Sequence, residues 1–144
     1  MTVSYEASLC GRQAVSCQVL ALPLRCYRCG AVTWAVAGVL APRALSLDPD
    51  GFVPFADVAG ELTATLDRSR LAVLGIGRLG WRRSRHVPAG YLSNGCRACD
   101  TIMGDFYLRE ALVEFLAEGG SYERLALDLW VDVSVAALDR ALGM

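Results

Sequence analysis

The chain of 144 residues contains no lysine, and its positive charge comes from fourteen arginines. Fifteen acidic residues leave a net charge of −1, so the chain as a whole has no general attraction to nucleic acid or to an anionic membrane. It also lacks the stretch of about 20 apolar residues that a membrane-spanning helix needs. A basic start followed by an apolar segment, which marks a secretory signal, is missing as well. We therefore expect a soluble cytoplasmic protein that does not bind membranes.

Repeats of fixed period and low-complexity linkers are missing too. The chain has the length of one ordinary domain, which is enough to bury a substantial core. Hydrophobic residues make up 54% of it and charged residues 20%, a composition that excludes disorder for most of the length. We therefore predict a single domain over residues 1–144. That this domain binds zinc is predicted from its cysteines.

Six cysteines are the unusual chemical resource of this chain. Two CxxC pairs, Cys26 with Cys29 and Cys96 with Cys99, are separated by 66 residues. Thiols stay reduced in the cytosol, so such pairs are metal ligands or redox groups more often than disulfides. Two residues between thiolates let a tight turn aim both sulfurs at one point, and two such turns complete a tetrahedral site. The spacing predicts one Zn²⁺ bound by these four cysteines.

We call the two CxxC turns the first knuckle (residues 26–30) and the second knuckle (residues 96–100). Gly30 and Asp100 directly follow the second cysteine of each turn. That position often requires positive φ, which glycine adopts freely and aspartate tolerates better than most residues. Four thiolates leave no open coordination position, so the zinc is expected to be structural and not catalytic. Oxidation of the zinc-bound thiolates is an alternative that would make the site a redox sensor.

Cys10 and Cys17 lie outside these pairs. Cys17 shares one face of an alternating segment with Val15 and Val19, so we predict that both remaining cysteines are small core residues. A reactive thiol or a second metal site is the alternative.

The first half of the chain shows the patterns of a hairpin followed by a helix. Alternating and β-branched residues predict strands over residues 15–24 and 32–36, with the first knuckle at the tip between them. A turn at residues 48–51 and a helix over about 54–66 follow. Because the knuckles are far apart, residues of about 41–79 are predicted to be a helical insertion packed on the metal-binding hairpins.

The second half adds a further helix and strand. Residues 79–92 are predicted to be a strand or an extended arm that leads to the second knuckle. A helical stripe over residues 108–116 ends at two glycines. Strict alternation over residues 125–135 favours a strand with one buried face, and a short helix over about 134–142 follows. Together the patterns predict an α+β fold of zinc-ribbon-like or treble-clef-like hairpins with an inserted helix.

Charge is unevenly distributed along the chain. Residues 68–100 contain seven arginines and one aspartate, a net charge of +6, whereas eight acidic residues and three arginines give residues 101–144 a net charge of −5. Trp81, Arg82, Arg83 and Arg85 form the densest basic part. Because arginine suits phosphate and tryptophan stacks on bases, these four are candidates for binding DNA or RNA.

The orientation of these side chains limits how many of them contact one partner. In an extended strand, Arg83 and Arg85 share a face with Trp81, while Arg82 points the other way. The alternative to nucleic-acid binding is a solvated surface whose arginines pair with the glutamates of residues 110–118.

Four short segments form a recognisable combination, residues 25–30 (RCYRCG), 83–84 (RS), 91–99 (YLSNGCRAC) and 104–108 (GDFYL). With them the chain resembles a zinc-ribbon-like module of uncharacterised bacterial proteins. The pattern of that module is similar to C-[WY]-x-C-G, then R-[YR]-S, then Y-x-x-N-x-C-x-x-C-G-x-x-x-G-D-F. The resemblance implies zinc and no established activity, and it does not extend to the middle or the C-terminus. Asp100 stands where the module has glycine.

The polar and aromatic residues of these segments are expected to have structural roles. We expect Asn94 to hydrogen-bond a cysteine sulfur or the backbone of the second knuckle. Asp105 is expected to cap the helix that begins near Phe106, and Phe106 to cover the metal. An enzyme would instead need His86, Asp105 and Glu110 to converge in a pocket.

The sequence therefore favours a non-catalytic, structural-zinc module that binds another molecule. A protein partner or a second copy of the chain is favoured, because the net charge is not basic and the apolar content leaves surface to bury in a complex. Binding of nucleic acid through residues 68–97 is the first alternative, and a zinc-thiolate redox sensor is the second.

Overall fold

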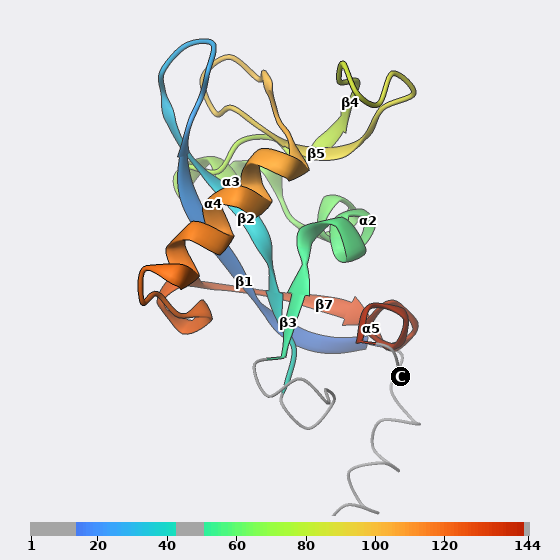
Figure 1. The fold of residues 1–144 in the computed structure, drawn as a ribbon. Helices are drawn as coiled ribbons and strands as arrows, with labels where there is room; N and C mark the ends of the chain where they lie inside the picture. Colours follow the sequence, from blue (N-terminus) through green and yellow to red (C-terminus); the bar gives the residue numbers. More distant parts are fainter. Residues whose placement is uncertain (1–13, 43–50, 143–144) are drawn as a thin grey trace, which may run out of the picture.

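The structure, a computed structural model, describes residues 14–42 and 51–142. Within these ranges the chain forms two antiparallel sheets and four α-helices, so the predicted α+β class is confirmed (Figure 1). None of the helices in these ranges is both long and apolar enough to cross a membrane. Cys10 and most of the predicted turn at residues 48–51 lie outside the described residues.

The larger sheet has the strand order β3–β2–β1–β7. Its strands are β1 (Ala14–Arg25), β2 (Val32–Leu40), β3 (Phe52–Pro54) and β7 (Ala126–Ser134). The predicted hairpin is confirmed as β1 and β2, in which Arg25 pairs with Val32 directly below the first knuckle. Figure 1 shows that the tip of this hairpin extends well beyond the rest of the sheet.

The smaller sheet carries the second knuckle between its last two strands. It has the order β4–β5–β6, with β4 (Gly80–Arg82), β5 (Tyr91–Gly95) and β6 (Ile102–Met103). The predicted arm over residues 79–92 is therefore two short strands joined by a turn. Ser84 and Val87 stabilise this turn, since the N–H of each donates to an oxygen of the other, at 3.2 and 3.0 Å.

The helices are α2 (Phe55–Thr65), α3 (Arg68–Val73), α4 (Asp105–Ala117) and α5 (Val135–Leu142), with a 3₁₀ turn η2 (Tyr122–Leu125). Helices α2, α4 and α5, and strand β7, confirm elements that the sequence predicts. Helix α3 is not among the predicted elements. It begins after Asp67, whose side chain accepts a hydrogen bond from the N–H of Ser69 (3.1 Å) and so caps the helix.

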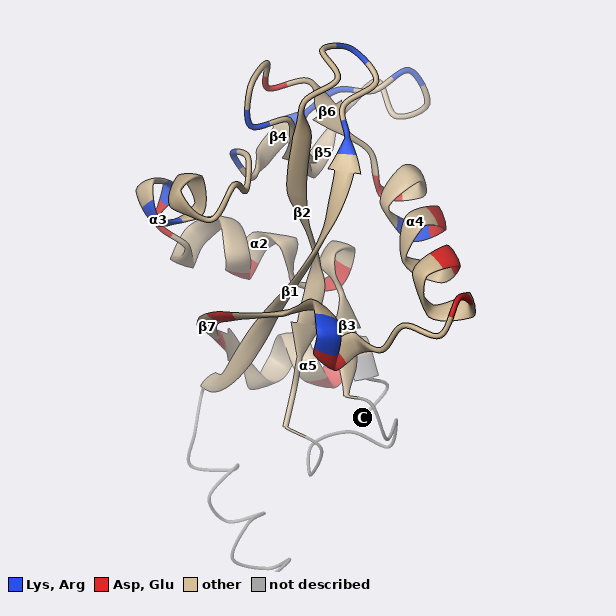
Figure 2. Cartoon of the chain, turned by 90° about the vertical axis from the view of Figure 1, so that its left-hand side faces the viewer, with Lys and Arg blue, Asp and Glu red and all other residues tan. Residues whose placement is uncertain are grey.

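Helices cover both faces of the larger sheet. Helix α2 contacts β7, β2 and β5, whereas α4 contacts β1 and β2. Figure 2 shows α2 and α4 on opposite sides of the β1–β2 layer. Residues 19–22 of β1 are accordingly buried without alternation. Cys17 is fully buried in this core, as predicted, and burial, with a smaller effect of Asp132, raises the pKa of its thiol to about 12.

The smaller sheet is attached to the outer edge of β2. Strand β3 pairs only with residues 38–40 of β2, and other groups bond the rest of that edge. The carbonyl of Gly75 accepts a hydrogen bond from the N–H of Trp34 (3.0 Å). The Asn94 side chain accepts from the N–H of Val36 (2.8 Å) and donates to its carbonyl (3.0 Å). The prediction that Asn94 bonds a cysteine or its knuckle is wrong, because its amide joins the two sheets.

Replacing Asn94 by alanine is expected to lower the free energy of unfolding by about 2–4 kcal/mol, because the N–H and C=O of Val36 lose their partners in the interior. Asn94 is 1% exposed, so water cannot readily replace it. Urea denaturation measures the change. Gln18→Ala is the control, since Gln18 makes one bond, from Nε2 to the carbonyl of Leu127 (2.9 Å). Equal losses in the two variants would contradict this role of Asn94.

Candidate metal centre

The tips of two hairpins bring the four predicted ligands together. The Sγ atoms of Cys26, Cys29, Cys96 and Cys99 all lie within 4.8 Å of one another. The Sγ atoms of Cys26 and Cys99 are 3.7 Å apart, and those of Cys29 and Cys96 are 3.5 Å apart. Four sulfurs bonded to one ion at about 2.3 Å in a tetrahedron are about 3.8 Å apart. The composition and spacing of the cluster therefore fit a single tetrahedral metal ion.

The two knuckles have the same hydrogen-bond pattern. In the first, the N–H groups of Arg28 and Gly30 donate to the sulfur and the carbonyl of Cys26, at 3.4 and 3.0 Å. In the second, the equivalent N–H groups donate to the sulfur and the carbonyl of Cys96, at 3.4 and 2.9 Å. Gly30 has φ +80° and Asp100 has φ +62°, as predicted for the residue after the second cysteine. Each turn thus places an N–H dipole on a sulfur, which stabilises a thiolate.

The surroundings of the sulfurs favour some thiolates over others. Burial of Cys96 opposes ionisation, but backbone N–H groups and the thiol of Cys29 lower its pKa to about 6. The Thr101 hydroxyl, 3.0 Å from the sulfur of Cys99, holds the pKa of that thiol below its usual value. For Cys29 a backbone N–H favours the thiolate, yet the neighbouring sulfurs, Cys96 foremost, raise its pKa to about 11. Like charges this close cannot all form unless a cation lies among them.

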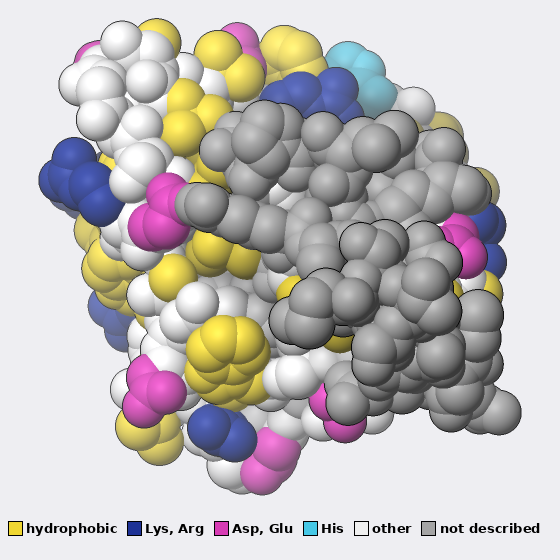
Figure 3. Space-filling view, turned by 90° about the horizontal axis from the view of Figure 1, so that it is seen from below, with side chains coloured by type: hydrophobic (Ala, Val, Ile, Leu, Met, Phe, Trp, Pro, Cys, Tyr) yellow, Lys and Arg dark blue, Asp and Glu magenta, His cyan; other side chains and the backbone are white. Residues whose placement is uncertain are grey.

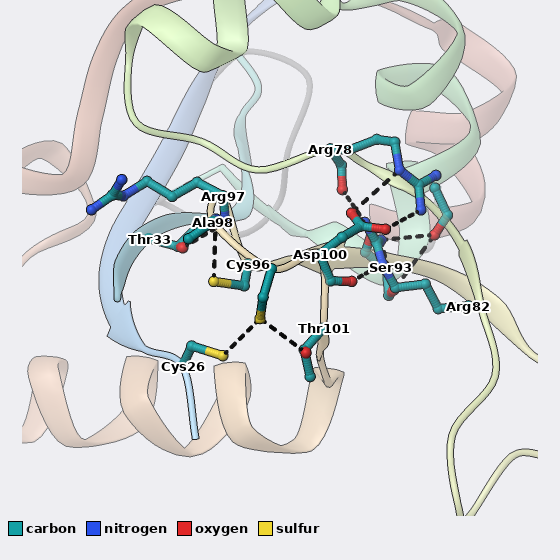
Figure 4. Close-up of polar contacts among 12 residues, drawn as sticks. Cys26, Thr33, Arg78, Arg82, Ser93, Cys96, Arg97, Ala98, Asp100 and Thr101 are labelled. Carbon is teal, nitrogen blue, oxygen red and sulfur yellow. Dashed lines mark hydrogen bonds and ion pairs between the residues drawn. The ribbon is translucent and has the colours of Figure 1, made fainter. Parts of the chain in front are cut away.

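Asp100 ties the second knuckle to two arginines (Figure 4). Its carboxylate oxygens lie 2.8 Å from Nη2 of Arg78 and 2.6 Å from Nη2 of Arg82. Burial raises the pKa of the Asp100 carboxyl, but the two guanidinium groups outweigh it and hold that pKa below its usual value. Asp100 therefore makes a link that a glycine, which stands at the equivalent position of the first knuckle, cannot make.

Arg82 is an interior residue, unlike its neighbours in sequence. It is 9% exposed, and its guanidinium donates to four backbone carbonyl groups as well as to Asp100. Trp81 is 60% exposed, and Arg83 and Arg85 are exposed as well. The candidate nucleic-acid residues are thus divided, with three side chains on the surface and Arg82 engaged within the fold.

The second knuckle also contacts the first hairpin directly. The backbone N–H of Arg97 donates to Oγ1 of Thr33 (3.0 Å), and its Nε donates to the carbonyl of Val32 (2.7 Å). Thr33 is completely buried. Sequence patterns did not identify Thr33 as part of the site, because its partner is 64 positions away. Thr101, in contrast, could have been predicted from the sequence, because its hydroxyl lies only two residues after Cys99 and can reach the sulfur locally.

The aromatic side chain beside the first knuckle is Tyr107. It lines a surface cavity of about 620 Å³ with Cys26 and Met103, and its hydroxyl donates to the carbonyl of Arg25 (3.1 Å). Phe106 is 73% exposed and lines a different cavity, so the prediction that it covers the metal is wrong. Adjacent residues of a helix point about 100° apart, so Tyr107 lies beside the first knuckle while Phe106 points away from it.

Asp105 does not cap α4, contrary to prediction. Gly104 occupies the N-cap position, and Asp105 is the first helical residue, with no capping bond from its side chain. One of its carboxylate oxygens is buried without a hydrogen-bond partner, and this desolvation raises the pKa of the carboxyl.

The residues that an enzyme would need to bring together come from separate places. Asp105 lines one surface cavity together with Phe55 and Leu112, whereas Glu110 lines a second cavity together with Pro23. His86 is exposed in the turn between β4 and β5.

Comparisons of this chain with models of protein families, with curated proteins and with solved structures find no match. The function must therefore be inferred from the geometry of the four cysteines and from the surface around them.

Proposed function

We propose that the four cysteines bind one Zn²⁺ and that this ion has a structural, non-catalytic role in a binding module. The observation that carries the proposal is the mutual proximity of four sulfur atoms from two hairpins that are far apart in sequence. A tetrahedral set of four thiolates is typical of zinc and iron sites, and closed sets of this kind belong to structural zinc. When bound, the ion neutralises part of the thiolate charge and fixes the tetrahedral arrangement.

The structural role follows from what the two knuckles connect. The first knuckle belongs to the larger sheet and the second to the smaller sheet. Besides the sulfur cluster, two hydrogen bonds of Arg97 connect the second knuckle to the first hairpin. A bound metal would therefore join the two sheets at this end and close the long loop that contains residues 41–79. We propose that residues 1–144 act as a single unit held in this way.

Metal analysis of the purified protein is expected to give one zinc per chain. Cys26→Ser and Cys96→Ser are each expected to abolish binding, because a metal with three thiolates in this closed site loses most of its affinity. Cys17→Ala is the matched control, since Cys17 is buried in the core away from the cluster and its variant should retain the zinc. Two zinc ions per chain, iron in place of zinc, or a metal-free folded protein would each contradict the proposal.

A further inference from the structure

We propose that one end of the molecule binds single-stranded nucleic acid, with Tyr27 and Trp81 stacking on bases and Arg28, Arg83 and Arg85 contacting phosphates. We call this surface the knuckle end, and it consists of residues 25–30, 78–90 and 96–100. The proposal rests on the proposed function, because a zinc ion would hold the two knuckles together within it.

Folding gathers positive charge at the knuckle end. Its residues contain seven arginines and one acidic residue, Asp100. Zinc with four thiolates carries a charge of −2, which leaves a net charge of +4. Figure 2 shows the basic positions concentrated in the loops at this end, and acidic positions along α4 and around β7 and α5. Seen from the opposite end, the visible acidic and basic side chains are interspersed (Figure 3).

Three of these arginines are available for a ligand. Within residues 14–42 and 51–142, the exposed side chains of Arg28, Arg83 and Arg85 take part in no ion pair or hydrogen bond. The other four arginines of the knuckle end donate to groups of the chain itself. Pairing of this segment with the glutamates of α4, the alternative drawn from the sequence, is therefore not seen in the described ranges. Unpaired guanidinium groups at one end are suited to phosphate.

The exposed tryptophan is held in place. Nε1 of Trp81 donates to the carbonyl of Ala89 (3.2 Å), although the side chain is 60% exposed. The indole also lies directly against Gly90, where a side chain would overlap it. Tyr27, in the first knuckle, is 76% exposed. A fixed aromatic ring beside unpaired arginines is the arrangement on which unstacked bases bind.

These aromatic rings favour a single strand over other acidic partners. Bases in a duplex are already stacked on one another, so their faces are not open to Trp81 or Tyr27. An acidic protein segment would satisfy the arginines but has no general requirement for two exposed rings. A single strand offers phosphates and free base faces together.

Fluorescence anisotropy of the zinc-containing full chain tests the proposal. The probes are labelled DNA and RNA single strands of about 12 nucleotides, a length within the range of small single-strand sites. We expect binding at low salt, weaker binding of the matched duplex, and little competition from polyglutamate. Three phosphate contacts predict that the logarithm of affinity falls with the logarithm of salt at a slope of about −2.

Matched variants locate the surface. Arg28→Ala with Arg83→Ala and Arg85→Ala is expected to reduce affinity at least tenfold. The control, Arg70→Ala with Arg124→Ala and Arg140→Ala, removes the same charge from residues outside the knuckle end and should bind as the unmodified protein does. Trp81→Ala is expected to weaken binding roughly fivefold to a hundredfold, the value of one stacked base. Trp130→Ala removes a comparably exposed tryptophan, at 54%, and should have no effect.

Several results would overturn the proposal. They are no binding at low salt, equal losses in the two arginine triples, equal affinity for the duplex, or full competition by polyglutamate. Zinc content measured on every variant separates this inference from the metal centre. A protein with one zinc per chain and no binding refutes the nucleic-acid surface alone, whereas a protein without zinc refutes the metal centre.

Discussion

Removal of the proposed zinc ion by a strong chelator is expected to abolish the cooperative thermal unfolding of this protein. Structural zinc contributes about 10–16 kcal/mol in finger peptides at neutral pH, which is as large as the total stability of a typical domain, about 5–15 kcal/mol. The physical reason is that the apo cluster would hold four close thiols or thiolates with no cation among them. Circular dichroism during heating, with and without chelator, measures the change.

The same loss is expected in Cys26→Ser and Cys96→Ser, because either substitution opens the tetrahedral set. Cys17→Ala serves as the control, since it removes a buried sulfur without touching the cluster and should cost only about 1 kcal/mol. Restoring zinc to the chelated protein should restore the transition. A metal-free protein that unfolds at an unchanged temperature would show that packing and the hydrogen bonds of Asn94, Gly75 and Arg97 hold the two sheets together without the ion.

Arg82→Ala is expected to lower the free energy of unfolding by about 2–4 kcal/mol. The guanidinium bonds Asp100 and four backbone carbonyl groups, so its removal leaves several buried acceptors without a donor. Asp100 is half exposed and keeps Arg78, which limits the cost of its unpaired charge. Urea denaturation of the zinc-containing protein measures the loss.

Arg83→Ala provides the matched control, because Arg83 is the next residue, carries the same charge and is exposed. Its effect on stability should stay within about 0.5 kcal/mol. Arg82→Lys should fall between the two, since an ammonium group cannot reach all of the acceptors that the planar guanidinium reaches. If Arg82→Ala and Arg83→Ala lowered the free energy of unfolding by similar amounts, the hydrogen bonds of Arg82 in the interior would not contribute to stability as expected.

The elements that the sequence predicts well are those with a local, periodic signal. The β1–β2 hairpin, helices α2 and α4 and strand β7 each repeat apolar residues at the spacing of their own geometry. Helix α3 is too short to show a period, and its only signal is the cap at Asp67. The turn between β4 and β5 is not predicted from the sequence. Residues on both sides of it are extended, and the turn depends on hydrogen bonds between Ser84 and Val87 that no residue pattern indicates.

The four cysteines were predictable because the CxxC spacing encodes the turn, whatever surrounds it. Their supporting residues were not, since Thr33 and Asn94 act on partners about 60 positions away. The alternation of side chains along a strand places Arg82 on the opposite face from Trp81, Arg83 and Arg85. It does not indicate which of the two faces is turned to the interior of the protein. Burial against Asp100 and Ser93 decides that, and only the tertiary structure brings those residues together.

The bonding along the outer edge of β2 has a consequence for aggregation. Trp34 and Val36 are bonded on this edge by Gly75 and Asn94, and Val32 by Arg97. A strand edge left open is a template on which another chain can add its own strand. Because the groups that shield the edge lie in and around the smaller sheet, loss of the metal would release the shield together with the knuckle. The zinc ion that we propose would thereby both stabilise one molecule and keep its β2 edge from pairing with a second.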